Sequence, residues 1–151
     1  MIGSQAPDFT LPDDKGNMTT LSAQKGKAVL LYFYPKDDTS GCTKQACAFR
    51  DQFPEFSDKN LLVLGVSKDS VVSHGRFRDK YSLNFPLLSD SEGTVCEAYG
   101  VWKEKSMYGK KYMGIERTSF LIDAEGIIRH IWPKVKIDGH AEDVLKIFTS
   151  L

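Results

Sequence analysis

The sequence predicts an α/β domain with a central mixed sheet flanked by helices. Two apolar runs, Ala28–Tyr34 and Leu61–Val66, lack polar alternation, which is typical of strands covered on both faces. An amphipathic stretch over residues 41–59 separates them, and a strand–helix–strand unit is right-handed in nearly all cases. A chain of 151 residues suits one domain that buries about two-thirds of its unfolded surface. We therefore expect a single domain over residues 1–151.

Residues 9–21 precede the first buried strand and predict a β-hairpin. Its turn is the polar segment Asp13–Asn17, in which glycine and asparagine tolerate positive φ. Residues 22–27 form a connector. The chain then enters the sheet at Ala28 and leaves it at Pro35, which has no backbone N–H to donate.

The first helix is expected to begin near Gly41, directly after that strand. Thr39 and Ser40 both suit its N-cap. Pro54 lies inside the helical pattern and is expected to kink or end the helix, with a short extension to Lys59.

The middle of the chain predicts shorter elements. A second helix is expected over Ser70–Tyr81, an extended link or short strand over 84–90, and a short helix over 92–99. Residues 101–113 are rich in Lys, Tyr and Gly and have no clear period. We expect an irregular segment there, with a strand around residues 101–102 as the alternative.

The last part of the chain predicts an antiparallel hairpin and a closing helix. The strands are Thr118–Asp123 and Ile127–Trp132, joined by a turn that ends in Gly126. Residues 140–151 place their apolar side chains on one helical stripe. A parallel βαβ unit followed by a hairpin and a helix is the element order of a thioredoxin-like fold.

Composition excludes several classes of partner. Twenty basic residues balance twenty acidic ones, so no net field favours nucleic acid or an anionic membrane. The apolar runs are too short to span a bilayer of roughly 30 Å. The first residues do not have the basic and apolar regions of a signal peptide. We therefore expect a cytoplasmic protein that binds neither nucleic acid nor membrane.

Cys42 is the strongest candidate for chemistry. Three cysteines, an odd number, without a secretion signal argue against a disulfide framework. Cys42 falls in the first turn of a helix, where unpaired N–H groups and a partial positive charge stabilise a thiolate. Lys36 and Lys44 could add positive charge. This position predicts a reactive thiol.

Cys47 follows Cys42 by five residues, about 140° around an α-helix and roughly 7.5 Å along it. A disulfide requires Cα atoms within about 7 Å, so the pair cannot bond while the helix is intact. Cys47 is therefore either a packed helix residue or a resolving thiol that reacts after the first turn unwinds. Cys96 is interpreted as a buried helix residue, with a resolving or incidental thiol as the alternative.

Other chemistries find little support. Nucleotide-binding, hydrolase-elbow and metalloprotease motifs are absent from the sequence, and the cysteine spacing does not suit a zinc site. Three scattered histidines, His74, His130 and His140, are expected on the surface or in the core. The aspartate pairs at 13–14 and 37–38 are expected to be solvated in turns. We expect no cofactor and no metal.

The pattern Pro35-x-x-x-Thr39-x-x-Cys42 matches the active-site signature of peroxiredoxins. The longer run over residues 32–47 resembles the Q-type branch, also called bacterioferritin comigratory proteins. The similarity continues in residues 6–13, 65–67 and 117–123 and so covers most of the chain. One departure is Ser40, where many members have proline; serine leaves the loop less fixed but removes no catalytic group.

The resemblance implies a thiol-dependent peroxidase that reduces hydrogen peroxide and small organic hydroperoxides, an antioxidant role in cell redox homeostasis. Cys42 would be the peroxidatic cysteine and become a sulfenic acid. Thr39 would hydrogen-bond the peroxide, Pro35 would shield the pocket, and Arg117 would hold the thiolate and polarise the peroxide. Cys47 would resolve the sulfenic acid as an intramolecular disulfide, which thioredoxin or a related dithiol reduces. The Q-type resemblance favours a monomer.

The residues are also compatible with three other functions. In a one-cysteine peroxidase, Cys47 would be structural and an external thiol would resolve Cys42. In a peroxide-sensing redox switch, the same cysteine would signal instead of turning over. In a metal-binding structural protein, the cysteines would hold zinc.

Overall fold

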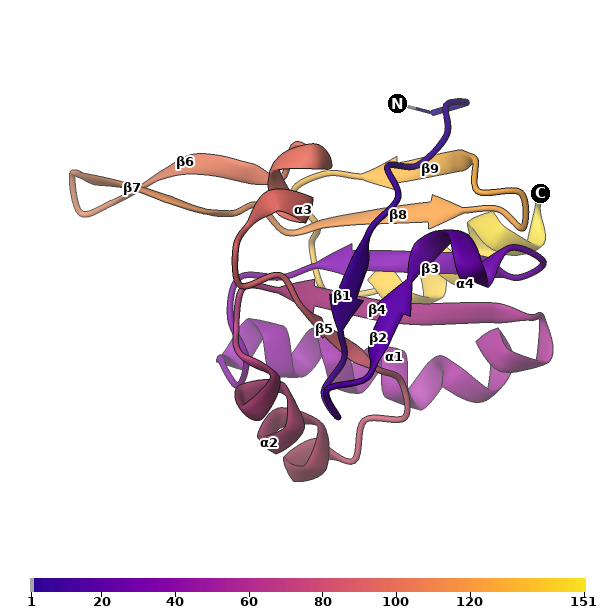
Figure 1. The fold of residues 1–151 in the computed structure, drawn as a ribbon, viewed down its shortest axis with the longest axis horizontal. Coiled ribbons are helices and arrows are strands. Elements are labelled where there is room, and N and C mark those ends of the chain that lie inside the picture. The colour runs from indigo at the N-terminus through magenta and orange to yellow at the C-terminus, as the bar shows by residue number, and fades with distance from the viewer. Residues whose placement is uncertain (1) are drawn as a thin grey trace.

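The computed structural model describes residues 2–151 and is built on a five-stranded sheet with the strand order β5-β4-β3-β8-β9. Strands β3, β4 and β5 are parallel, whereas β8 is antiparallel to β3 and β9 is antiparallel to β8. The sheet is therefore mixed, as the sequence predicts (Figure 1). The strands are β3 (Ala28–Phe33), β4 (Leu61–Ser67), β5 (Leu87–Ser89), β8 (Thr118–Ile122) and β9 (Ile128–Trp132).

Both faces of the sheet are covered, which explains why its central strands lack polar alternation. Every residue of β3 is buried. Leu30 belongs to an apolar cluster with helix residues Phe49 and Val144, whereas Leu31 belongs to a cluster on the other face with Phe9 and Tyr99. One face carries the helices α1 (Ser40–Asp58), α2 (Val71–Tyr81) and α4 (His140–Thr149); the other carries β1 (Thr10–Pro12), β2 (Met18–Thr20), the 3₁₀ helix η1 (Leu21–Gln24) and α3 (Thr94–Ala98) (Figure 1).

The N-terminal hairpin is confirmed, with β1 and β2 paired antiparallel. Its turn closes through the Asp13 carboxylate, which accepts the backbone N–H groups of Lys15 and Asn17 at 2.9 and 3.0 Å. In the part of the chain from residue 2 onward, no helix combines the length and the hydropathy needed to cross a membrane.

Helix α1 continues past Pro54, so this residue does not end the helix, and the expected extension to about Lys59 is confirmed by the C-cap at Lys59. Proline cannot donate to the carbonyl of Arg50, four residues earlier. That carbonyl instead accepts from Nδ2 of Asn84 at 3.1 Å. A side-chain amide from the loop after α2 thus replaces the missing helical hydrogen bond, and α1 extends to Asp58.

Helix α2 begins as the sequence predicts. Ser70 is its N-cap, and the Ser70 hydroxyl accepts the backbone N–H of Ser73 at 3.1 Å. At the other end, Ser82 adopts the left-handed conformation with φ of 52° and lets the chain leave the helix. Helix α3 is shorter than the expected 92–99, since it covers Thr94–Ala98.

The expectation of an irregular segment over residues 101–113 is wrong, whereas the alternative of a strand around residues 101–102 is confirmed, since β6 begins at Trp102. The segment forms β6 (Trp102–Met107) and β7 (Lys110–Ile115), an antiparallel two-stranded sheet that projects from the body of the molecule (Figure 1). Tyr108 and Gly109 both have positive φ, 52° and 77°, as tight hairpin turns require. Most of this ribbon is open to solvent on both faces. It therefore lacks the apolar alternation by which strands are recognised.

His140 begins α4 in a buried, largely apolar site. Its ring makes edge contacts with those of Phe49 and Trp132, at centroid distances of 5.8 and 5.5 Å, and Nε2 lies 2.8 Å from the Ser119 hydroxyl. Burial lowers the pKa of His140 from 6.5 to about 4, against a smaller opposing effect of Asp143. The neutral imidazole is thus the form that the folded protein holds.

The free energy of unfolding is therefore expected to fall between about pH 6.5 and about pH 4, because the unfolded chain binds a proton that folded His140 does not. Urea titrations at pH 7 and pH 4.5 measure how much the free energy of unfolding falls between these two pH values. This fall should be about 1–2 kcal/mol smaller in His140→Gln than in wild type. Identical pH slopes in wild type and His140→Gln would contradict the assignment.

Candidate active site

Cys42 lies in the first turn of α1, just beyond the carboxyl end of β3. Its side chain is buried, with 2% of the residue exposed. The Cys42 sulfur accepts a hydrogen bond from Nη2 of Arg117 at 3.3 Å. A helix N-terminus and a guanidinium thus lie beside one thiol, which are surroundings typical of reactive cysteines.

Arg117 comes from a segment 75 residues further along the chain. It precedes β8, whose antiparallel register pairs Phe33 with Thr118 and so brings Arg117 to the end of β3 where α1 begins. Its Nη1 donates to Oε1 of Gln45 at 2.6 Å. The two ends of the guanidinium therefore hold Cys42 and Gln45, which lie one helical turn apart.

Gly41 leaves room for this guanidinium. A Cβ atom at position 41 would lie 3.3 Å from Nη2 of Arg117 and 3.3 Å from Cδ1 of Ile137. Both contacts are tighter than ordinary van der Waals contact, so a side chain there would press on the group that binds the Cys42 sulfur.

Thr39 and Pro35 lie in the loop between β3 and α1. Thr39 is the N-cap of α1, but its hydroxyl donates to the carbonyl of Lys36 at 3.0 Å and makes no capping bond. Its single hydrogen is thus directed to the loop rather than to the Cys42 sulfur. Pro35 is half-buried and precedes the polar part of the loop.

Cys42 and Cys47 lie in the same uninterrupted helix, and both are free thiols. Cys47 is half-buried. Cys96 belongs to the apolar cluster on the opposite face of the sheet from Cys42. Burial, followed by its hydrogen bond with Asp90, raises the pKa of the Cys96 thiol well above its ordinary value. Of the three cysteines, Cys96 is the one packed as an inert core residue.

The positive charges around the site differ in part from those expected. Lys44 forms an ion pair with Asp138 on the surface. Lys105 of β6 is instead the lysine whose pKa depends on the site. Partial burial, and then the charge of Arg117, lower the pKa of the Lys105 ammonium, whereas Cys42 raises it. The projecting hairpin therefore contributes a cation near Arg117.

Gln45 was missed by the sequence reasoning. It is 1% exposed, and the hydrogen atoms on its buried Nε2 have no partner among residues 2–151. A polar residue three positions after a reactive cysteine lies on the same helical face. That spacing is the signal that could have identified Gln45.

Asp37, Asp69 and His74 form a group of potential metal ligands, with their ligand atoms within 4.8 Å of one another. Both ring nitrogens of His74 already face acceptors, Asp37 Oδ2 at 2.7 Å and the Leu88 carbonyl at 2.9 Å. The group is therefore a hydrogen-bonded network. The expectation that the aspartate pairs are solvated is wrong for Asp37 and also for Asp14, which are 8% and 9% exposed.

Comparison with known proteins identifies the family. Residues 2–131 match the AhpC/TSA family model. A putative peroxiredoxin Bcp of Coxiella burnetii is 59% identical over 144 residues, 95% of each chain. Peroxiredoxin Bcp of Bacillus subtilis is 49% identical over 150 residues, 99% of this chain and 96% of its own. The chain is a peroxiredoxin.

Solved structures agree with this assignment. A cysteine-to-serine variant of Xylella fastidiosa PrxQ superposes with a TM-score of 0.94 at 40% identity, covering 99% of this chain and 96% of its own. The bacterioferritin comigratory protein of Xanthomonas campestris, studied for its alkyl peroxide reduction activity, gives 0.90 at 44% identity, with coverages of 94% and 90%. The predicted thioredoxin-like fold and the resemblance to Q-type peroxiredoxins are confirmed. This peroxiredoxin is a thiol-dependent peroxidase.

Proposed function

We propose that Cys42 is the peroxidatic cysteine and that it reduces hydrogen peroxide and small organic hydroperoxides. The observation that carries this assignment is the 3.3 Å hydrogen bond from Arg117 Nη2 to the Cys42 sulfur. A buried thiol at a helix N-terminus with a guanidinium on its sulfur has the surroundings that activate a nucleophilic cysteine.

In the first step, the Cys42 thiolate attacks the terminal oxygen of the hydroperoxide. The S–O bond forms, the O–O bond breaks, and the leaving alkoxide or hydroxide takes a proton to become alcohol or water. The sulfur loses two electrons and becomes a sulfenic acid. Arg117 stabilises the negative charge as it moves from sulfur to the leaving oxygen.

Thr39 and Pro35 complete the proposed pocket. Rotation of the Thr39 hydroxyl away from the Lys36 carbonyl, its partner at 3.0 Å, would allow it to hydrogen-bond the bound peroxide. Backbone N–H groups in the first turn of α1, including that of Cys42, would donate to the same oxygens. Pro35 adds an apolar, donor-free wall that restricts water.

In the second step, Cys47 attacks the Cys42 sulfenic acid. The S–S bond forms, the S–O bond breaks, and the released hydroxide takes a proton to become water. Because α1 is continuous through both residues, its first turns must unwind before the sulfurs can meet. Thioredoxin or a related dithiol then reduces the disulfide by thiol exchange.

A one-cysteine mechanism is the second candidate. Cys47 is half-buried in an intact helix, an arrangement that also suits a packing role with an external thiol resolving Cys42. A peroxide-sensing switch would use the same first step without rapid turnover. We propose the two-cysteine cycle in a single-domain monomer of the cytoplasm, a reducing setting consistent with three free thiols.

Peptide mapping after one equivalent of hydrogen peroxide tests the proposal. The expected product is a single peptide pair linked through Cys42 and Cys47, with Cys96 recovered as a free thiol. Cys42→Ser should abolish peroxide consumption, since it removes the nucleophile, while Cys96→Ala should not. A stable sulfenic acid on Cys42 with Cys47 free would overturn the two-cysteine cycle in favour of the one-cysteine mechanism.

A further inference from the structure

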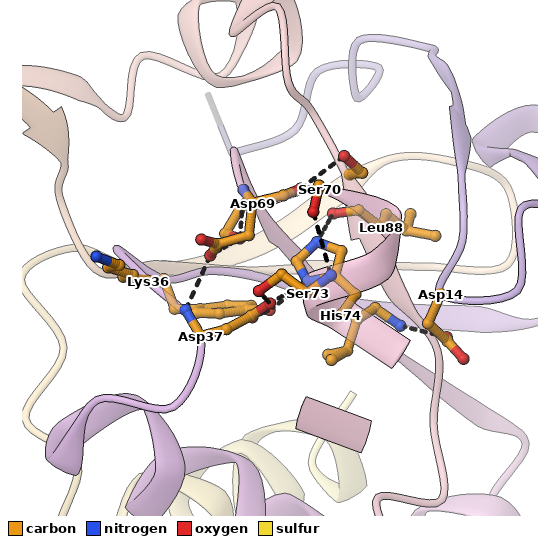
Figure 2. Close-up of polar contacts among 12 residues, drawn as sticks. Asp14, Lys36, Asp37, Asp69, Ser70, Ser73, His74 and Leu88 are labelled. Carbon is orange, nitrogen blue, oxygen red and sulfur yellow. Dashed lines mark hydrogen bonds and ion pairs between the residues drawn. The ribbon is translucent and has the colours of Figure 1, made fainter. Parts of the chain in front are cut away.

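A buried polar network lies behind the loop that leads into the active site. Figure 2 shows Asp37 from this loop meeting His74 and Ser73 of α2, with Asp69 on its other side. His74 is fully buried, and Asp37 is 8% exposed. The reaction steps proposed above use none of these side chains, although Asp37 lies only five residues before Cys42.

The hydrogen-bond partners define the charge of the pair. The Leu88 carbonyl, 2.9 Å from His74 Nε2, can only accept, so Nε2 carries a hydrogen. Nδ1 and Asp37 Oδ2, 2.7 Å apart, must then share one proton, because two lone pairs would repel at that distance. Whether the proton resides on the ring or on the carboxyl, the pair has no net charge.

Both carboxylate oxygens of Asp37 accept further hydrogen bonds. Oδ1 accepts from the Tyr34 hydroxyl at 2.5 Å, and Oδ2 also accepts from the Ser73 hydroxyl at 2.8 Å. Removing His74 would therefore leave a buried carboxylate with neutral donors only, and an unpaired buried charge is strongly unfavourable. Asp37 would then move toward water or take up a proton.

The backbone of Asp37 is fixed by the same network. Its N–H donates to Asp69 Oδ2 at 2.8 Å, and that oxygen also accepts the Ser67 hydroxyl at 2.7 Å. The Ser89 hydroxyl donates to the Asp69 carbonyl at 2.6 Å. Groups at the carboxyl ends of β4 and β5 thus hold the loop that leaves β3.

The next residue, Asp38, is held by α2 as well. It adopts the left-handed conformation with φ of 56°. Its carboxylate accepts from Lys80 Nζ and from the Tyr81 hydroxyl, both at 2.7 Å. Asp37 and Asp38, the two residues that immediately precede Thr39, are therefore both hydrogen-bonded to side chains of α2.

We propose that His74 is a positioning residue for peroxide reduction. Through Asp37, it fixes the turn that carries Pro35 and Thr39 against the start of α1, so that the pocket around Cys42 reforms in one geometry after each cycle. This inference rests on the proposed role of Cys42. The loop residues of this network precede Thr39 in the chain, whereas the helical turns that must unwind for disulfide formation follow it. The network therefore stays folded while the start of α1 unwinds.

The proposed role of His74 predicts different effects on the two chemical steps, peroxide attack and disulfide formation. Attack on peroxide requires the loop and the helix start to be aligned, and small displacements of reacting groups can cost up to 10²-fold in rate. Disulfide formation takes place in the unwound state, which does not require that alignment. A defect in the His74–Asp37 pair should therefore slow the first step and spare the second.

His74→Gln is the primary test. Stopped-flow oxidation of the reduced enzyme by hydrogen peroxide should be slowed about 10-fold or more, whereas disulfide formation from the sulfenic acid should change by less than about 2-fold. Asp37→Asn should behave similarly. The double variant Asp37→Asn/His74→Gln, with a neutral hydrogen-bonding pair, should oxidise several-fold faster than either single variant.

Leu21→Ala is the matched control, because it removes buried contacts on the opposite face of the sheet and lowers Tm without touching the loop. Equal slowing of oxidation in His74→Gln and in Leu21→Ala would overturn the inference, as would equal slowing of both steps. If His74→Gln does not fold, Ser73→Ala removes one hydrogen bond to Asp37 and should slow oxidation about 3-fold, again sparing resolution.

The same measurements distinguish this inference from the assignment of Cys42. If the wild-type protein forms no sulfenic acid on Cys42, the proposed function fails. If wild type oxidises Cys42 normally and both His74→Gln and Ser73→Ala do so at the wild-type rate, only the role of His74 fails.

Discussion

Arg117→Leu is expected to lower the second-order rate constant for oxidation of Cys42 by hydrogen peroxide about 10²–10³-fold. The substitution removes the donor that lies 3.3 Å from the Cys42 sulfur. It removes the positive charge that we propose stabilises the thiolate and the leaving oxygen, and a single such donor is worth about 10²–10³ in rate in other enzymes. Stopped-flow kinetics on the reduced protein measures this step directly.

Two further variants make the result specific. Arg117→Lys keeps the charge but loses the planar fork that bonds Cys42 and Gln45 together, so its rate should fall between those of wild type and Arg117→Leu. Arg129→Leu removes an arginine from an exposed ion pair with Asp123 and should leave the rate unchanged. A wild-type rate in Arg117→Leu would show that the guanidinium does not act in the reaction.

The part of the site contained in one short segment could be predicted from the sequence. The end of a buried strand, a turn and a helix start follow one another within residues 32–47, so local rules place Cys42 at a helix N-terminus. The same rules exclude a Cys42–Cys47 bond in the intact helix. These statements need only distances along one element, which the sequence determines well.

Arg117 could not be selected by local rules, because its position depends on the pairing of β8 with β3. The chain has several arginines, and nothing in the pattern around residue 117 distinguishes it from Arg50. The family resemblance identified it, and the strand register gives the physical reason. Arg50 instead donates to the carbonyl of Tyr81 at 2.7 Å.

Asp37 is a residue whose environment the local sequence pattern predicts incorrectly. A pair of aspartates in a turn is usually solvated, but Asp37 is buried because a histidine from α2, 37 residues away, lies 2.7 Å from it. The continuation of α1 past Pro54 and the β6–β7 hairpin have the same origin. A distant amide replaces a helical bond, and a ribbon exposed on both faces lacks a periodic signal. In each case a tertiary contact or its absence overrides the local pattern.

Cys47→Ser is expected to abolish thioredoxin-supported turnover while leaving the first oxidation intact. Serine preserves the size and the helical environment of the half-buried side chain, so the thiolate of Cys42 should meet peroxide at the wild-type rate. Without a second sulfur, the sulfenic acid cannot become a disulfide. Steady-state peroxide consumption should fall by a factor of about 10² or more, the loss typical when a group that a step requires is removed.

A burst experiment separates this outcome from a simple loss of activity. One equivalent of peroxide should be consumed at the wild-type rate, and dimedone should then label Cys42 in Cys47→Ser but not in wild type. Cys96→Ala, whose thiol is buried on the other face of the sheet, should retain both burst and turnover. Continued turnover of Cys47→Ser with thioredoxin would mean that the reductant itself resolves Cys42. Helix α1 would then have no need to unwind, and the continuous helix through both cysteines would be the working structure throughout the cycle.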